Sequence, residues 1–245
     1  MKLHIGISIA TAGQLAELPE LKKVDFLELP FSLCGQPEFT LPKSWKNRLH
    51  RISGRSESRT LNSLIDTGNV MRREFYRLFS RNCAVASSLK AGEVTLAIDW
   101  EYAFDNAGYA AELREILRCC YGIAFKFSLT PVIELRIPGS AVLKPADFIR
   151  LRNSWMIPVR TLIDLHPHEP GSLEMLENFF AANRFECNKF RISYDAAGGN
   201  YLTVKLLDRI KNCICPVGSE IPELCFYPGR NADREAFQAI LPVIA

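Results

Sequence analysis

The sequence predicts an α/β protein that folds as a single (β/α)8 barrel, a TIM barrel, over residues 1–245. Short β-rich runs alternate with longer amphipathic stretches, a pattern typical of a parallel sheet with crossover helices. Eight such runs are found, and a chain of 245 residues suits one barrel of this kind, which commonly has about 250 residues. No internal repeat or linker interrupts the alternation, so we expect one domain.

The predicted strands are rich in β-branched and aromatic residues and are bounded by polar or turn-forming residues. In chain order they are LHIGISI from Leu3, VDFLEL from Val24, RLHRIS from Arg48, EVTLAID from Glu93, PVIELRI from Pro131, VRTLIDL from Val159, NKFRISY from Asn188 and ELCFY from Glu223.

Between these strands, apolar residues recur at spacings of three and four, which predicts helices. The expected helices cover residues 12–22, 69–90, 110–128, 145–155, 172–183, 201–212 and 232–244. Helix-start signals support three of them: Pro145 in a first turn, Ser172 followed by an acidic residue, and Asp233. The segment 31–46 is expected to be irregular.

Composition and charge exclude several classes of function. The net charge of +3 comes without a basic block, so no nucleic-acid partner is expected. No apolar run reaches the roughly 18 to 20 residues that a membrane span needs, and the amino terminus reads as a strand and not as a signal peptide. We therefore expect a cytoplasmic protein whose eight cysteines are reduced core residues.

Alternation along the strands predicts which side chains point into the barrel, because the more apolar set of each strand should pack against the outer helices. The third strand is ambiguous between the faces of His50 and Arg51. The inward polar residues expected from the other strands are Glu28, Asp99, Glu134, Arg136, Asp164, His166, Lys189, Arg191, Ser193, Asp195 and Tyr227.

Carboxylates that converge inside a barrel require a compensating positive charge, because a buried unpaired charge is costly. A divalent metal, the inward cations Arg136, Lys189 and Arg191, or a bound ligand would each provide it. Barrel enzymes carry their chemistry at the carboxyl ends of the strands, where we expect the candidate site.

The segments PVIELRIPG from Pro131 and TLIDLHPH from Thr161 resemble the xylose-isomerase-like barrels, a superfamily of sugar isomerases, epimerases, dehydratases and endonucleases. The resemblance implies a divalent metal held by a Glu of the fifth strand, an Asp of the sixth with a His behind it, a His of the seventh and a Glu of the eighth. Glu134 and Asp164 match the first two positions, and Glu28 matches a Glu at the end of the second strand.

The sequence departs from this pattern on the last two strands. The seventh strand has Arg191 and Ser193 in place of a His, and the eighth has Cys225 to Tyr227 in place of a Glu. Two interpretations follow. Glu134, Asp164 and His166 could hold Mn²⁺, Zn²⁺ or Mg²⁺ with water completing the shell, or Arg191 could occupy the cation position and pair with Glu134 and Asp164, so that no metal is bound.

The resemblance implies a sugar or polyol isomerase or epimerase, with sugar phosphates among its substrates, that moves a proton next to a carbonyl. Glu134, Asp164 and His166 are the catalytic candidates. The expected substrate-binding residues are Glu28, Asp99, Arg136, Lys189, Arg191 and Tyr227. Two alternatives stay open: a sugar-binding barrel without catalysis, and a Schiff-base dehydratase resembling the type I dehydroquinases, with His166 as acid/base and Lys189 as the amine.

Overall fold

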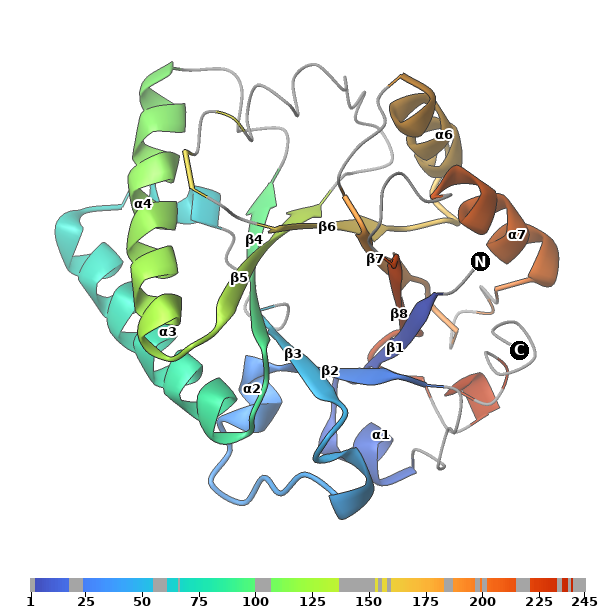
Figure 1. Cartoon of the computed structure of the whole chain (residues 1–245), viewed down its shortest axis with the longest axis horizontal. Coiled ribbons are helices and arrows are strands. Elements are labelled where there is room, and N and C mark those ends of the chain that lie inside the picture. The colour runs from blue at the N-terminus through green and yellow to red at the C-terminus, as the bar shows by residue number, and fades with distance from the viewer. Residues whose placement is uncertain are drawn as a thin grey trace.

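The computed structural model is a closed barrel of eight parallel strands with helices on its outside (Figure 1). The strands follow one another around the barrel in chain order, and β8 pairs with β1 to close it. The structure describes residues 3–17, 24–54, 61–65, 67–99, 107–136, 160–182, 187–196, 202–214 and 221–232, with the single positions 153, 156, 157, 199, 235–237 and 239. The predicted fold class is therefore confirmed.

All eight predicted strands are present. They are β1 His4–Ser8, β2 Phe26–Pro30, β3 Leu49–Ser53, β4 Glu93–Asp99, β5 Thr130–Arg136, β6 Arg160–Leu165, β7 Lys189–Ser193 and β8 Glu223–Tyr227.

The helices differ from prediction mainly at their ends. They are α1 Ala12–Glu17, α2 Phe31–Cys34, α3 Asn69–Ser88, α4 Ala107–Lys126, α6 Ser172–Ala182 and α7 Val204–Cys213, with 3-10 turns at Lys43–Trp45 and Leu61–Leu64. The segment expected to be irregular thus contains α2 and one 3-10 turn. The helix predicted over 145–155 and most of the last one lie outside the described residues.

The barrel wall contains an irregularity between β2 and β3. Leu27 pairs with Leu49 while the next residue, Glu28, pairs with Arg51, so His50 is an extra residue in β3. Such a bulge changes the direction of neighbouring side chains. This explains why alternation alone did not decide between the His50 and Arg51 faces.

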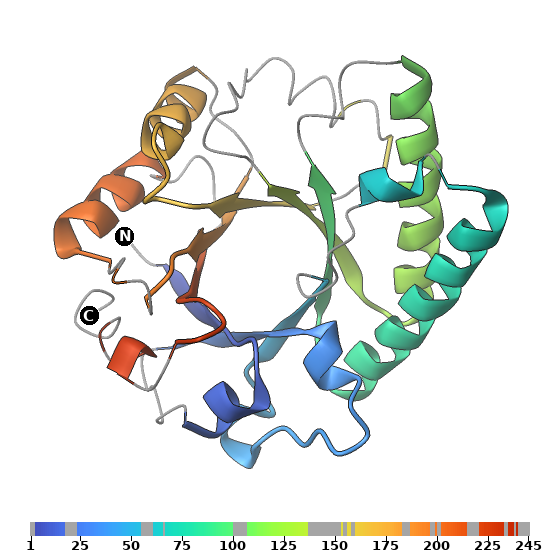
Figure 2. The same ribbon diagram turned by 180° about the vertical axis from the view of Figure 1, so that it is seen from behind.

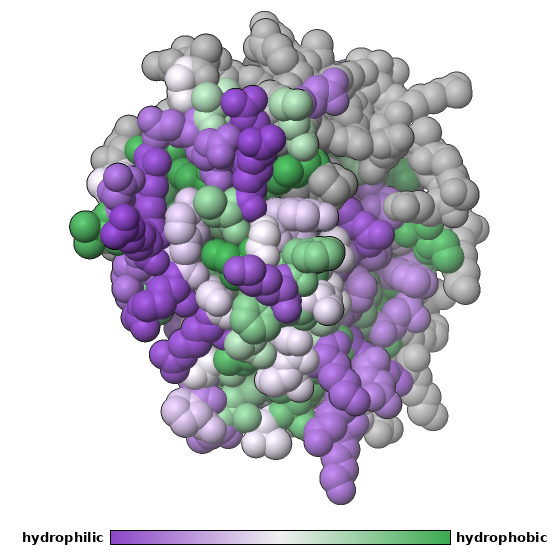
Figure 3. Space-filling view, turned by 60° about the vertical axis from the view of Figure 1, so that its left-hand side comes forward, coloured by the Kyte–Doolittle hydropathy of each residue, from purple (hydrophilic) through white to green (hydrophobic). Residues whose placement is uncertain are grey.

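Apolar side chains fill the space between the barrel and its helices. Ile133, Leu135, Ile163 and Leu165 on the outer faces of β5 and β6 are at most 1% exposed. On the side of α3 and α4, Figures 1 and 2 show two long helices against this wall, and Figure 3 shows hydrophilic and apolar side chains mixed on the surface seen from that side. No helix in the described part of the chain is both long and apolar enough to cross a membrane.

Candidate functional site

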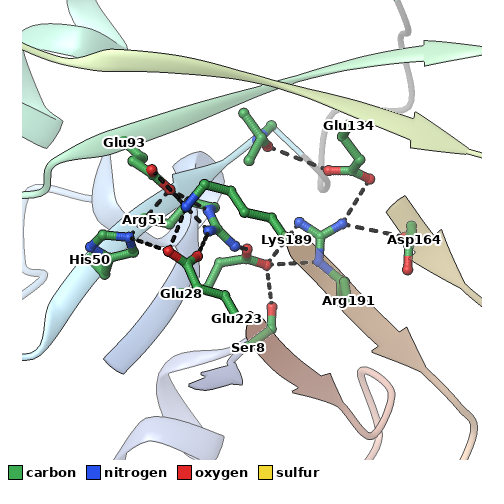
Figure 4. A network of polar contacts seen from close by, with 12 residues as sticks. Ser8, Glu28, His50, Arg51, Glu93, Glu134, Asp164, Lys189, Arg191 and Glu223 are labelled. Carbon is green, nitrogen blue, oxygen red and sulfur yellow. Dashed lines mark hydrogen bonds and ion pairs between the residues drawn. The ribbon is translucent and has the colours of Figure 1, made fainter. Parts of the chain in front are cut away.

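A buried ion network fills the middle of the barrel, and its centre is Arg191 (Figure 4). Arg191 on β7 lies among Glu28 of β2, Glu134 of β5 and Asp164 of β6, and we call these four residues the Arg191 group. All four are at most 2% exposed. Side chains from four strands therefore meet inside the barrel, as alternation predicts.

The guanidinium of Arg191 contacts all three carboxylates. Its Nη1 lies 2.8 Å from Oε1 of Glu134 and 3.3 Å from Oδ2 of Asp164. Its Nε donates to Oε1 of Glu28 at 2.9 Å, and Nη2 lies at the same distance from that oxygen. The pairing of Arg191 with Glu134 and Asp164 that the sequence suggested is present, with Glu28 as a third partner.

This arrangement keeps Arg191 positively charged. Burial alone would lower the pKa of its guanidinium, but the charges of Glu134, Glu28 and Asp164 raise it well above the ordinary value. Small hydroxyls complete the carboxylate shells, because Ser8 donates to Glu28 at 2.9 Å and Thr95 to Glu134 at 3.4 Å. The charges of the group are thus closely paired, as buried charges need to be, although Nη2 of Arg191 makes no hydrogen bond with a described residue.

His166 lies directly after β6, at the carboxyl end of the barrel. Its Nε2 is 3.9 Å from Oδ1 of Asp164 and its Nδ1 is 3.8 Å from Oε1 of Glu169. The His166 side chain is 37% exposed, whereas Asp164 is buried and also accepts a hydrogen bond from the Ser193 hydroxyl. A half-exposed imidazole backed by a fixed carboxylate is a common arrangement for proton transfer.

A second buried network occupies the amino end of the barrel. It comprises His50 and Arg51 of β3 with the first residues of three other strands, Glu93, Lys189 and Glu223, and we call it the amino-end group. Arg51 lies 2.9 Å from Glu93 and 2.5 Å from Glu223, and Nζ of Lys189 lies 3.0 Å from Glu93. Arg51 also reaches Glu28 at 3.3 Å, which connects the two groups.

The amino-end group is held in its charged form. Hydrogen bonds to Glu223 and Glu93 raise the pKa of His50 to about 9, despite partial burial. Burial would raise the pKa of Glu93 and Glu223, but His50, Arg51 and Lys189 outweigh it, so the pKa of Glu93 falls well below its usual range and that of Glu223 to about 2. At neutral pH this group therefore combines three cations with two anions.

The structure brings five predicted site residues together: Glu28, Glu134, Asp164, His166 and Arg191. Tyr227 is half-buried at the end of β8, where its backbone is in register with Ser193. The side chains of Asp99 and Arg136 lie outside the described part, although their backbones are paired at the ends of β4 and β5.

Lys189 needs a correction, because it does not lie with the Arg191 group. It is the first residue of β7, 1% exposed, and pairs with Glu93 and Glu223 at the amino end. Alternation gives the face of a side chain but not its height along the barrel axis. A buried, doubly paired ammonium at this end does not suit the amine of a Schiff base, which must be neutral to react.

Sequence reasoning missed Glu93, Glu223 and Arg51. The sequence could have indicated the two carboxylates. Glu93 lies on the same face of β4 as Asp99, and Glu223 lies on the same face of β8 as Tyr227, because an even number of positions separates each pair. Both were overlooked because they begin their strands, far from the end at which barrel enzymes place their chemistry.

The two groups differ in how they fit a divalent metal. In the Arg191 group the guanidinium already lies between the carboxylates that would hold the ion. In the amino-end group, ligand atoms of His50, Glu93 and Glu223 lie within 4.8 Å of one another, but Arg51 and Lys189 already bind those carboxylates. His50, Glu93 and Glu223 are therefore the described residues that could hold a divalent ion, in competition with these two cations.

Solved structures of other proteins share this architecture. No protein-family model matches the sequence, and no curated protein matches it. A xylose isomerase domain protein from Planctomyces limnophilus superposes with a TM-score of 0.60 at 10% identity, over 99% of this chain and 95% of the other. D-psicose 3-epimerase from Clostridium cellulolyticum H10, solved with D-tagatose, gives 0.54 at 10% identity over 99% and 96%.

The chain has the fold of the xylose-isomerase-like sugar isomerases and epimerases. The resemblance seen in the sequence is thereby confirmed at the level of fold. A GH53 catalytic domain from Ignisphaera aggregans is similar to the same degree, with a TM-score of 0.61 at 10% identity over 92% of this chain and 87% of that one. Because one barrel fold supports many reactions, the function has to be argued from the site.

Proposed function

We propose that this protein is a sugar or polyol isomerase or epimerase that transfers a proton with Asp164 and His166, while Arg191 holds the carboxylates that would otherwise bind a divalent metal. The observation that carries the proposal is the contact of half-exposed His166 with buried Asp164, which is itself fixed by Arg191 and Ser193. The pair lies at the carboxyl end of β6, where barrel enzymes act.

Each residue of the site has a distinct part in this proposal. His166 removes a proton from the carbon next to a carbonyl and returns it, since its imidazole is the exposed group of the pair. Asp164 orients that imidazole and accepts sugar hydroxyls. Glu134 and Glu28 keep Arg191 in place, so Glu134 is a positioning residue and not the base. Arg136, whose backbone is in register with Asp164, is our candidate for the cation that stabilises the enediolate oxygen.

Exchange of substrate hydrogen with solvent deuterium tests this proposal directly. The purified chain, treated with chelator, is incubated in D₂O with a panel of ketoses, aldoses and their phosphates, and deuterium incorporation is followed by NMR. We expect exchange next to the carbonyl of at least one sugar. The exchange rate of the His166→Gln variant should be about 100- to 10,000-fold lower than that of wild type, which is the usual contribution of a general acid/base.

His168 provides the matched control, because it is exposed and lies two residues further along the same loop. The His168→Gln variant should exchange at the wild-type rate. Exchange that is absent for the whole panel, or that is equally fast in His166→Gln, would contradict the proposed chemistry.

A sugar-binding barrel without catalysis is the second candidate. One observation favours it: Glu134 and Asp164 are already paired with the guanidinium of Arg191, so both carboxylates are engaged inside the barrel. Buried carboxylates and their hydroxyl neighbours still suit the binding of sugar hydroxyls. Calorimetric binding of a sugar that shows no exchange in D₂O would favour this candidate over the first.

A further inference from the structure

Arg191 keeps one donor that the ion network does not use. Its side chain is 0% exposed, yet Nη2 makes no hydrogen bond with a described residue. Nη2 lies 2.9 Å from Oε1 of Glu28, but Nε already donates to that oxygen. Nη1 contacts Glu134 and Asp164. The charge of the guanidinium is therefore well paired, while the N–H groups of Nη2 have no acceptor among the described residues.

A buried donor without an acceptor is unfavourable and rare in folded proteins, so it indicates a partner that the chain itself does not supply. That partner is an acceptor, because a guanidinium carries donors only. A further anion beside Arg191 is disfavoured, since three carboxylates already face this single cation and like charges repel at short range. The acceptor that suits Nη2 is thus an uncharged oxygen of a hydroxyl or carbonyl group.

The Arg191 group lies below the carboxyl end of the barrel, where barrel enzymes bind their substrates. Its member Asp164 lies 3.9 Å from His166 at that end. The inward positions that follow toward the same end carry small side chains on three strands, namely Ser53 on β3, Ala97 on β4 and Ser193 on β7. These strands therefore place small side chains between the Arg191 group and the carboxyl end, which suits a ligand that reaches Nη2 from there.

We infer that Nη2 of Arg191 binds the hydroxyl oxygen on the carbon that His166 deprotonates, so that Arg191 contacts the substrate and selects an α-hydroxycarbonyl compound. Asp164 links the two residues, because it lies 3.9 Å from His166 and 3.3 Å from Arg191. A catalytic metal likewise keeps one position open for water or substrate. The identity of the oxygen rests on the proposed function, whereas the binding of an uncharged oxygen at Nη2 does not.

A hydroxyl group suits this position better than a carbonyl oxygen. It accepts from Nη2 through a lone pair and can donate its own proton to a carboxylate at the same time. Glu134 and Asp164 lie close by, at 2.8 and 3.3 Å from Nη1 of the same guanidinium. Hydrogen bonds to charged groups are about twice as strong as those between neutral groups. The site should therefore discriminate between a substrate with this hydroxyl and one without it.

Two small ketones that differ by this hydroxyl test the inference: hydroxyacetone contains the α-hydroxycarbonyl unit, and acetone lacks the hydroxyl. Binding to the wild-type chain is followed by NMR of isotope-labelled arginine side chains, with D-fructose as a third probe. We expect hydroxyacetone and fructose to shift the Arg191 signal, and hydroxyacetone to bind at least about tenfold more tightly than acetone. The signal of Arg209, which is exposed and paired with Glu177, is the control and should not shift.

Arg191→Lys identifies the Arg191 signal, because it removes Nη2 while it keeps a positive charge among the carboxylates. This variant should lose the preference for hydroxyacetone over acetone. If it does not fold, slow hydrogen exchange with water identifies the buried guanidinium groups of Arg51 and Arg191 in wild type. A shift of neither signal by hydroxyacetone would then overturn the inference.

The outcomes separate this inference from the proposed function. A shift of the Arg191 signal by hydroxyacetone, without deuterium exchange in any sugar, would support the site and overturn the proposed function. Deuterium exchange without any shift of that signal would overturn the site alone. Equal binding of acetone and hydroxyacetone, or a preference that persists in Arg191→Lys, would also overturn the site. The absence of both the shift and the exchange would overturn both proposals.

Discussion

Arg191 supplies a positive charge that three buried carboxylates need. Each of Glu28, Glu134 and Asp164 is at most 2% exposed, and all three contact the same guanidinium. A planar group with several donors can serve three acceptors at once, which a Lys ammonium on a flexible stem does less well. Arg191 therefore does by itself what a bound divalent ion would do between such ligands.

Removal of this charge should destabilise the fold strongly. We expect Arg191→Met to lower the free energy of unfolding by about 3 to 5 kcal/mol, because it leaves buried carboxylates without a partner. Denaturation in urea measures the change. The matched control is Arg209→Met, which breaks a pair between Arg209 and Glu177 whose side chains are 46% and 40% exposed and should lower the stability far less, because water screens an exposed pair. Equal losses in both variants would contradict the buried role.

At the scale of single residues, the sequence predicts the strand face on which a side chain lies better than it predicts which side chains meet inside the barrel. Alternation identified Glu28, Glu134, Asp164 and Arg191 as inward residues, and they meet. It did not separate Lys189 from Arg191, because both lie on the same face of β7 and the face alone does not say which carboxylates lie at the height of each. The contact of Arg191 with Glu28 joins strands β7 and β2, which are not neighbours in the barrel, so no local pattern could reveal it.

At the scale of elements, the bulge in β3 places His50 and Arg51 on the same two carboxylates. His50 contacts Glu93 and Glu223 at 3.3 and 3.6 Å, while its ring packs edge-on against Phe26 at 5.4 Å. The extra residue that makes this possible is set by the pairing of the whole strand, which is why the sequence left the third strand ambiguous.

The raised pKa of His50 predicts a loss of stability at alkaline pH. The folded pKa is about 9 against an ordinary value of 6.5, so the contribution of His50 is complete below pH 6.5 and disappears as the pH rises through 9. After allowance for its partial exposure we expect a loss of about 1 to 2 kcal/mol. Unfolding of wild type and His50→Gln between pH 6 and 10 should show this slope in wild type alone; parallel curves would contradict it.

Two glycines should respond in opposite ways to a methyl group. A Cβ at Gly6 on β1 would overlap the ring of Phe26, whereas one at Gly122 in α4 meets nothing within 4 Å. We expect Gly6→Ala to cost about 1 to 3 kcal/mol through overpacking and Gly122→Ala to stabilise by about 0.5 to 1 kcal/mol, because Ala favours a helix. Melting temperatures that shift in the same direction would contradict the packing described for β1 and β2.

At the scale of the whole molecule, the sequence predicts best the features that repeat along the chain. Eight alternating runs predict eight strands, and closure follows because parallel strands of this number form a filled barrel. Helix ends were less certain, since capping sets them residue by residue: α7 begins after Thr203, whose hydroxyl accepts the Leu206 N–H. The rim loops follow no such periodicity, so the hydrogen bonds of Gln14 with carbonyls of residues 229–232 were not predicted.

The interior of the barrel is charged at two levels along its axis. The amino-end group and the Arg191 group are joined through Arg51 and Glu28, and between them five carboxylates face Arg51, Lys189, Arg191 and His50 among the described residues. A barrel interior is more often packed with branched apolar side chains. Here the near-balance of charge lets polar layers replace part of that packing.

Metal analysis of the purified protein tests most directly the claim that Arg191 fills the cation position. The chain is purified without chelator, incubated with Mn²⁺, Zn²⁺ and Mg²⁺ in turn, desalted, and examined by elemental analysis and thermal unfolding. We predict that the Arg191 group holds no divalent ion, so any ion that the protein retains is lost in His50→Gln, which removes a ligand of the amino-end group. One ion retained per chain in both wild type and His50→Gln, with a melting temperature that falls when the ion is removed, would contradict the account.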